Sequence, residues 1–119
     1  MRKRLQPNEQ QAVSRFLDLL HQQLRDRVQQ VVLFGSKARG DSSAWSDIDV
    51  LIVVDQEDWR LSHAIGDLAA DVSLECDVLL GPRVIGQERW ERMKQRGFGL
   101  YQNVAAEGIP FTQWSPAGR

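Results

Sequence analysis

The sequence holds 119 residues, which is enough for one sizeable hydrophobic core and too few for two full domains. Its 15 basic and 16 acidic residues leave a net charge of -1, so no overall positive field is available to hold nucleic acid. The single cysteine, Cys76, excludes an internal disulfide and a cysteine-cluster zinc site. We therefore expect one domain over residues 1–119 and no direct nucleic-acid partner.

Apolar segments are short throughout the sequence. The longest, Val50–Val54, is far below the ~20 residues that a membrane-spanning helix needs. The basic residues Arg2, Lys3 and Arg4 are not followed by the apolar region of a secretory signal. We expect a soluble, cytoplasmic protein that does not contact a membrane.

The first half of the chain predicts a helix, a strand and a helical turn. Asn8 is the expected cap of the helix, whose apolar residues recur at steps of three and four. These residues are Val13, Phe16, Leu17, Leu20, Leu24 and Val28. Val31–Phe34 predicts a buried strand that stops at Gly35, followed by a helical turn from Ser36 to about Gly40 and a loop over 41–43.

The second strand, predicted over Asp47–Val54, carries two acidic residues. A strand alternates its side chains between two faces, so Asp47 and Asp49 point the same way. A helix with apolar positions between Leu61 and Ala69 then leads to a third predicted strand, Ser73–Leu80.

In the third predicted strand, the same alternation places Glu75 and Asp77 on one side. After Gly81 and Pro82 we expect two short helices, separated by Gly97. The first of these helices surrounds Trp90 and Met93, the second surrounds Tyr101 and Val104, and an extended piece follows over 109–111.

The region from the first to the second strand suggests a phosphate and metal site. Glycine allows close approach of the backbone, and amide groups at the start of a helix favour phosphate, so Gly35 and Ser36 predict a phosphate-binding turn. Two adjacent carboxylates repel each other unless a cation lies between them, and Mg²⁺ or Mn²⁺ prefers such oxygen ligands. Asp77 completes a cluster of three with Asp47 and Asp49 if its strand lies beside theirs, and three carboxylates can bridge two metal ions.

These residues resemble the signature of the DNA polymerase beta superfamily of nucleotidyltransferases. The segment LFGSKARGDSSAWSDIDVLIVV, residues 33–54, is similar to the small members called minimal nucleotidyltransferases. The likeness extends over most of the chain, through Asp77, Gly86–Trp90 and Glu107–Pro110. It implies a mixed α/β (α+β) fold of the DNA polymerase beta type, in which a short mixed sheet is flanked by helices.

The resemblance also implies a reaction in which an acceptor hydroxyl attacks the α-phosphate of ATP and pyrophosphate leaves. Asp47 and Asp49 would hold two Mg²⁺ or Mn²⁺ ions, and Asp77 would bind the ion that activates the acceptor. The phosphate-binding group would comprise residues of the turn. These are Gly35, Ser36, Arg39 and, as a weaker candidate, Lys37.

Single-domain members of this family resemble the antitoxin half of a pair with HEPN-domain (higher eukaryotes and prokaryotes nucleotide-binding) toxins. This likeness predicts transfer of AMP to a tyrosine of such a partner. Two alternatives stay open: an antitoxin or nucleotide sensor that acts by contact without catalysis, and a small-molecule transferase of the aminoglycoside type.

Several further residues have structural as well as functional interpretations. Trp45 can stack on a base or pack on the domain, and Trp59 and Trp114 can form a partner surface. Trp90 is expected in the core, and Cys76 as a small apolar group. His21 and His63 have no neighbouring ligands at metal spacing and are expected to have structural or surface roles.

Overall fold

A computed structural model describes residues 5–40 and 47–111 of the chain. The elements follow in the order α1 (Pro7–Leu24), β1 (Val28–Phe34), α2 (Ser36–Arg39), β2 (Ile48–Val54), α3 (Trp59–Cys76), β3 (Leu80–Gly86), α4 (Gln87–Arg96), α5 (Gly99–Glu107) and β4 (Ile109–Pro110). The predictions for Trp45 and Trp114, and for the loop over 41–43, concern residues outside the described ranges. No helix in the described ranges is both long enough and apolar enough to cross a membrane.

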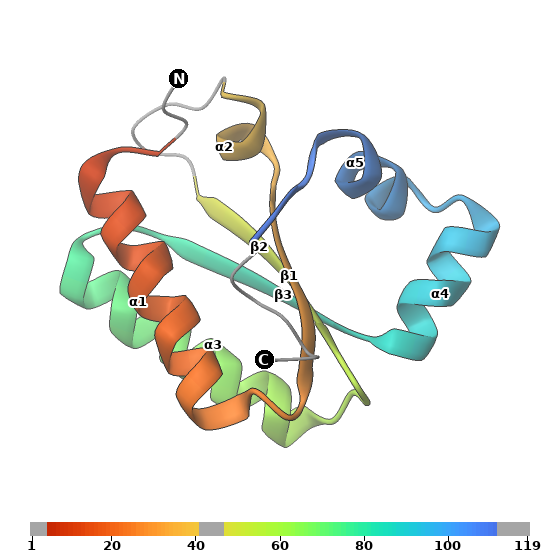
Figure 1. Cartoon of the computed structure of the whole chain (residues 1–119), viewed down its shortest axis with the longest axis horizontal. Helices are drawn as coiled ribbons and strands as arrows, with labels where there is room; N and C mark the ends of the chain where they lie inside the picture. Colours follow the sequence, from red (N-terminus) through yellow and green to blue (C-terminus); the bar gives the residue numbers. More distant parts are fainter. Residues whose placement is uncertain (1–4, 41–46, 112–119) are drawn as a thin grey trace.

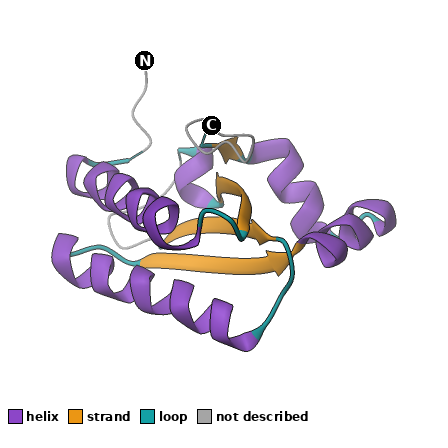
Figure 2. Cartoon of the chain, turned by 60° about the horizontal axis from the view of Figure 1, so that its bottom comes forward, coloured by secondary structure: helices purple, strands orange, loops and turns teal. Residues whose placement is uncertain are grey.

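The strands form one mixed sheet in the order β3-β2-β1-β4 (Figure 1). β1 is antiparallel to both β2 and β4, whereas β2 and β3 run parallel. Helices lie on both sides of the strands (Figure 2). The expected fold class, a short mixed sheet flanked by helices, is therefore confirmed.

Two hydrophobic clusters cover the two faces of the sheet. One face of β2, with Ile48, Val50, Ile52 and Val54, packs with the buried sides of α1 and α3. The other face includes Leu51 and Val53 and packs against residues of α4 and α5, among them Trp90 and Val104. Trp90 is buried as expected and lies 5.2 Å from the ring of Tyr101, centroid to centroid.

The first helix starts two residues earlier than expected and uses a different cap. Gln6 precedes the helix, Pro7 occupies its first position, and Glu9 accepts a hydrogen bond of 2.7 Å from the backbone N–H of Gln6. The prediction of Asn8 as the cap is therefore wrong: its side-chain amide instead donates to the carbonyl oxygen of Cys76, 3.2 Å away. The helix ends at Leu24, and Val28, predicted on its apolar stripe, begins β1.

The prediction of a third strand over Ser73–Leu80 is also wrong. α3 instead continues to Cys76, because buried Ala69 and Val72 extend the apolar stripe of the helix. The helix ends at Asp77, which adopts the left-handed conformation with a φ of 57°. β3 follows from Leu80 and includes Gly81 and Pro82, which the sequence analysis placed between the third strand and the next helix.

The last elements agree with the sequence pattern. α4 and α5 surround the expected apolar residues, and Gly97, with a φ of 68°, ends α4 and separates the two helices. β4 is the expected extended piece and pairs with Val32 and Leu33 of β1.

Candidate active site

The two aspartates of β2 border one space at the edge of the sheet. Asp49 lies opposite Phe34 of β1 on one side and opposite Gly81 of β3 on the other. A methyl group built on Gly81 would lie 3.6 Å from Oδ1 of Asp49 and 3.9 Å from Oδ2 of Asp47. Both carboxylates therefore face the same side, as the alternation of the strand predicted.

Gly35 is required by the position of Asp49. Its φ of 78° lies in a region that favours glycine, and a Cβ atom there would overlap Oδ2 of Asp49. The missing side chain thus lets the carboxylate lie directly against the turn between β1 and α2.

The electrostatic surroundings of Asp49 favour a bound cation. Burial raises the pKa of the Asp49 carboxyl above its usual range, and the negative charge of Asp47 raises it further. Arg83 and Arg39 act in the opposite direction. A divalent cation shared by the two carboxylates would offset both unfavourable contributions, and oxygen donors of this kind suit Mg²⁺.

The turn after β1 contributes backbone, one hydroxyl and one guanidinium. α2 spans only Ser36–Arg39, and Ser36 is half-buried. Nη1 of Arg39 lies 3.2 Å from Oε1 of Glu107 at the end of α5, an ion pair that joins the turn to this helix. Arg39 is also close enough to Asp49 to lower the pKa of that carboxyl.

Lys37 points away from this space. Its side chain is 2% exposed, and Nζ lies 2.5 Å from Oε2 of Glu9 on α1. The structure therefore does not bring the Lys37 ammonium to the carboxylates, and the expectation that it reaches a triphosphate is not met by its geometry. A lysine in a polar turn gives no sequence signal for burial, because its partner lies 28 positions earlier on another helix.

Asp77 also lies apart from Asp47 and Asp49. It caps the end of α3 rather than pointing from β3, and no three His, Cys, Asp or Glu residues within 5–40 and 47–111 gather closely enough to hold a metal ion. The position beside Asp49 on the neighbouring strand belongs to Gly81. This difference follows from the extension of α3, which moves β3 along the sequence.

Arg83 is a residue near the site that sequence reasoning did not select. It is exposed, lies two positions after Gly81 on β3, and is close enough to Asp49 to lower the pKa of that carboxyl. The alternation of a strand starting at Leu80 would have indicated it, but the strand was predicted too early in the chain.

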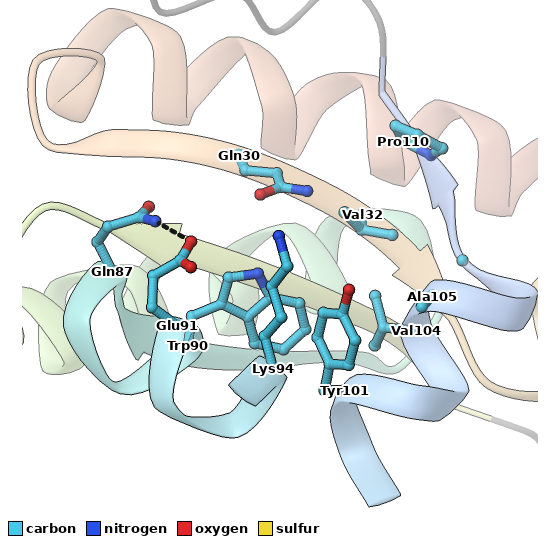
Figure 3. A pocket seen from close by; sticks show the side chains of 11 residues that line it. Gln30, Val32, Gln87, Trp90, Glu91, Lys94, Tyr101, Val104, Ala105 and Pro110 are labelled. Atoms are coloured by element: carbon cyan, nitrogen blue, oxygen red, sulfur yellow. Dashed lines mark hydrogen bonds between the residues drawn. The ribbon is translucent and has the colours of Figure 1, made fainter. Parts of the chain in front are cut away.

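A separate cavity of about 360 Å³ lies between β1 and the helices α4 and α5 (Figure 3). The side chains of Gln30, Trp90, Lys94 and Tyr101 contribute polar atoms to it. None of the predicted site residues lines this cavity. It is therefore distinct from the space bordered by the two aspartates.

Trp59 and Cys76 lie at the two ends of α3. Trp59 is 72% exposed at the start of α3, where the guanidinium of Arg60 lies 5.1 Å from its ring. Cys76 is half-buried at the end of the same helix and packs against the α1–α3 core.

Comparison with known proteins agrees with this geometry. Residues 13–99 match the family described as nucleotidyltransferase domain. The chain is 35% identical over 101 residues to "Putative protein adenylyltransferase MJ0604" of Methanocaldococcus jannaschii, covering 85% of this chain and 95% of that protein.

Two solved structures share the fold. "Structure of putative minimal nucleotidyltransferase" matches with a TM-score of 0.54 and 25% identity, over 89% of this chain and 97% of the other. A toxin-antitoxin structure with AMP-PNP matches with a TM-score of 0.56 and 20% identity, over 82% of this chain and 69% of the other. The family match covers most of the chain, and the M. jannaschii relative aligns over nearly its whole length. This chain therefore belongs to the nucleotidyltransferase domain family.

Proposed function

We propose that this nucleotidyltransferase is an antitoxin that transfers AMP from ATP to a tyrosine hydroxyl of a partner HEPN-domain toxin. The observation that carries the proposal is the meeting of Asp47 and Asp49 in one space beside the Gly35 turn. The relative in M. jannaschii is named as a protein adenylyltransferase, and a structural neighbour is a toxin-antitoxin structure with AMP-PNP. These names support a nucleotide substrate and a protein acceptor.

Each group of residues would have a different role in the reaction. Asp47 and Asp49 would hold Mg²⁺ or Mn²⁺, which supplies charge neutralisation and polarises the reacting oxygens. The backbone at Gly35, the hydroxyl of Ser36 and the guanidinium of Arg39 would bind the β- and γ-phosphates. Lys37 would stabilise this turn through its ion pair with Glu9 of α1 and would not contact the phosphates.

The reaction forms one bond and breaks one. The acceptor oxygen bonds to the α-phosphorus of ATP, while the bond from that phosphorus to the bridging oxygen of the β-phosphate breaks. Pyrophosphate leaves with the electron pair, and the proton of the acceptor hydroxyl passes to water. The attacking and leaving oxygens lie roughly in line across the phosphorus.

Incubation of the purified chain with its HEPN-domain partner and ATP labelled in the α-phosphate tests the proposal. We expect label on the partner with Mg²⁺ and none after EDTA, with loss of transfer in Asp49→Asn. Asp67→Asn, which changes an exposed aspartate on α3, is the matched control and should transfer as the wild type does. A wild-type chain that labels no partner, or an Asp47→Ala/Asp49→Ala variant that still neutralises the toxin, would favour an antitoxin that acts by contact.

A further inference from the structure

The edge of the sheet beside Asp49 presents an open strip on β3. Gly81 and Arg83 lie on one face of this edge strand, and Leu79, which directly precedes the strand, is 59% exposed. The next residue in this alternation, Ile85, belongs to the α4–α5 cluster, so the strip lies on the same face as Asp49. Gly81 has no side chain to fill the space next to the carboxylates.

The positive charge on this strip has no ion-pair partner in the part of the chain that the structure describes. Arg83 is exposed and forms no ion pair among residues 5–40 and 47–111. Arg39, the other cation near Asp49, is paired with Glu107. An unpaired guanidinium beside an open apolar residue is complementary to a carboxylate carried on a polypeptide.

The direction of the reaction places the acceptor on this side. In the proposed function, on which this inference rests, pyrophosphate leaves over the Gly35–Ser36 turn at the end of β1. β2 lies between β1 and β3, so the line from the leaving oxygen through a phosphorus above Asp49 continues toward β3. The acceptor hydroxyl must approach from there.

We propose that Leu79, Gly81 and Arg83 form the acceptor-binding strip, and that Arg83 pairs with a carboxylate next to the accepting hydroxyl of a polypeptide. Gly81 provides the entry beside Asp47 and Asp49, and Leu79 gives the segment an apolar contact. Arg83 is then a specificity-determining residue for the acceptor and not for ATP.

Steady-state transfer to the HEPN-domain partner tests this assignment when each substrate is varied while the other is saturating. Arg83→Glu should raise the KM for the partner about tenfold or more and leave the KM for ATP within about twofold. Arg92→Glu, which reverses an exposed arginine paired with Glu88 on α4, is the matched control and should change neither constant. Replacing acidic residues beside the labelled tyrosine of the partner by lysine should restore transfer by Arg83→Glu.

The outcomes separate the two proposals. If the wild type labels no partner, the proposed function fails and this inference fails with it. If the wild type transfers normally but Arg83→Glu raises the KM for ATP, Arg83 belongs to the nucleotide site. Unchanged constants for both substrates would also overturn the acceptor assignment while leaving the proposed function intact.

Discussion

The position of Asp49 depends on the absence of a side chain at Gly35. The carboxylate lies where any other residue at position 35 would place its Cβ atom, and the φ of 78° adds a backbone preference for glycine. Burial of this carboxylate and the charge of Asp47 both raise its pKa, so a cation bound beside it would stabilise the ionised form. A substitution at Gly35 would therefore also change the position and the pKa of the Asp49 carboxyl.

A comparison of Gly35→Ala with Gly97→Ala separates displacement of Asp49 from the strain of an alanine at positive φ. We expect a loss of roughly 1–3 kcal/mol in the free energy of unfolding and loss of AMP transfer, because the new methyl group displaces Asp49. Gly97→Ala, at a φ of 68° remote from the carboxylates, should lower stability by about 1–2 kcal/mol and leave transfer unchanged. Urea unfolding and transfer assays on both variants provide the comparison; full activity of Gly35→Ala would contradict the contact.

A single substitution, Asp77→Asn, distinguishes Asp77 as the cap of α3 from Asp77 as a metal ligand. In the structure it caps α3, and asparagine is also tolerated in the left-handed conformation, so Asp77→Asn should fold normally. Because the carboxylate lies apart from Asp47 and Asp49, we expect transfer within about threefold of the wild type, whereas Asp49→Asn should lose at least about a hundredfold. An equally large loss in Asp77→Asn would support the third metal ligand predicted from the sequence.

Among the elements, α1 and α2 are joined by a buried ion pair. Glu9 accepts from the backbone of Gln6 at the start of α1 and also pairs with Lys37 of α2. The turn between β1 and β2 is therefore anchored to the first helix.

Lys37→Met should destabilise the protein by about 3–5 kcal/mol, because it leaves the carboxylate of Glu9 buried without its partner. Glu9→Gln combined with Lys37→Met should be less destabilised than Lys37→Met alone, since no buried charge is left. Chemical denaturation of the three variants measures these differences. A cost below about 1 kcal/mol for Lys37→Met would show that the pair does not anchor the turn.

The start of α3 should respond to pH. Asp58 accepts a hydrogen bond from the backbone N–H of Leu61, and this bond and the side chain of Arg27 hold the pKa of Asp58 below its ordinary value of 3.8. A carboxyl with a lower pKa in the folded state stabilises the fold above its unfolded pKa, and this contribution disappears as the pH falls through the folded pKa.

Thermal unfolding of Asp58→Ala against the wild type checks this expectation. The wild type should be more stable at neutral pH, and the difference in Tm should shrink as the pH is lowered from about 5 to below 3.8. Asp58→Asn keeps an acceptor for the backbone N–H of Leu61, so its Tm should lie between those of the wild type and Asp58→Ala. A difference in Tm that stays constant over this range would exclude the ionised carboxylate as its cause.

The sequence was sufficient for the elements that obey a strong local pattern. The apolar spacing of α1, the alternation of β2 and the glycine after β1 predicted both aspartates on one face beside the turn. It was not sufficient where tertiary structure decides: β3 contains Gly81 and Pro82, which usually mark a turn, and α3 takes up residues with a strand-like alternation. The burial of Lys37 and the position of Arg83 depend on these long-range arrangements.

At the scale of the whole molecule, the mixed sheet brings the contributors to the site from three separate parts of the chain. β1 supplies the glycine turn, β2 the two aspartates and β3 the open strip, while the cores on both faces hold the strands in register. A ligand that binds where these three strands meet, beside Asp47 and Asp49, stabilises the whole fold. At a ligand concentration 100 times its Kd, the free energy of unfolding rises by about 2.7 kcal/mol.

Calorimetric titration of the wild type and of Asp49→Asn with AMP-PNP, with and without Mg²⁺, tests the central claim most directly. The account predicts binding by the wild type that requires Mg²⁺ and is weakened at least about tenfold in Asp49→Asn, a difference of about 1.4 kcal/mol or more. Equal affinity of the two proteins, or binding by the wild type that is unaffected by removal of Mg²⁺, would contradict it.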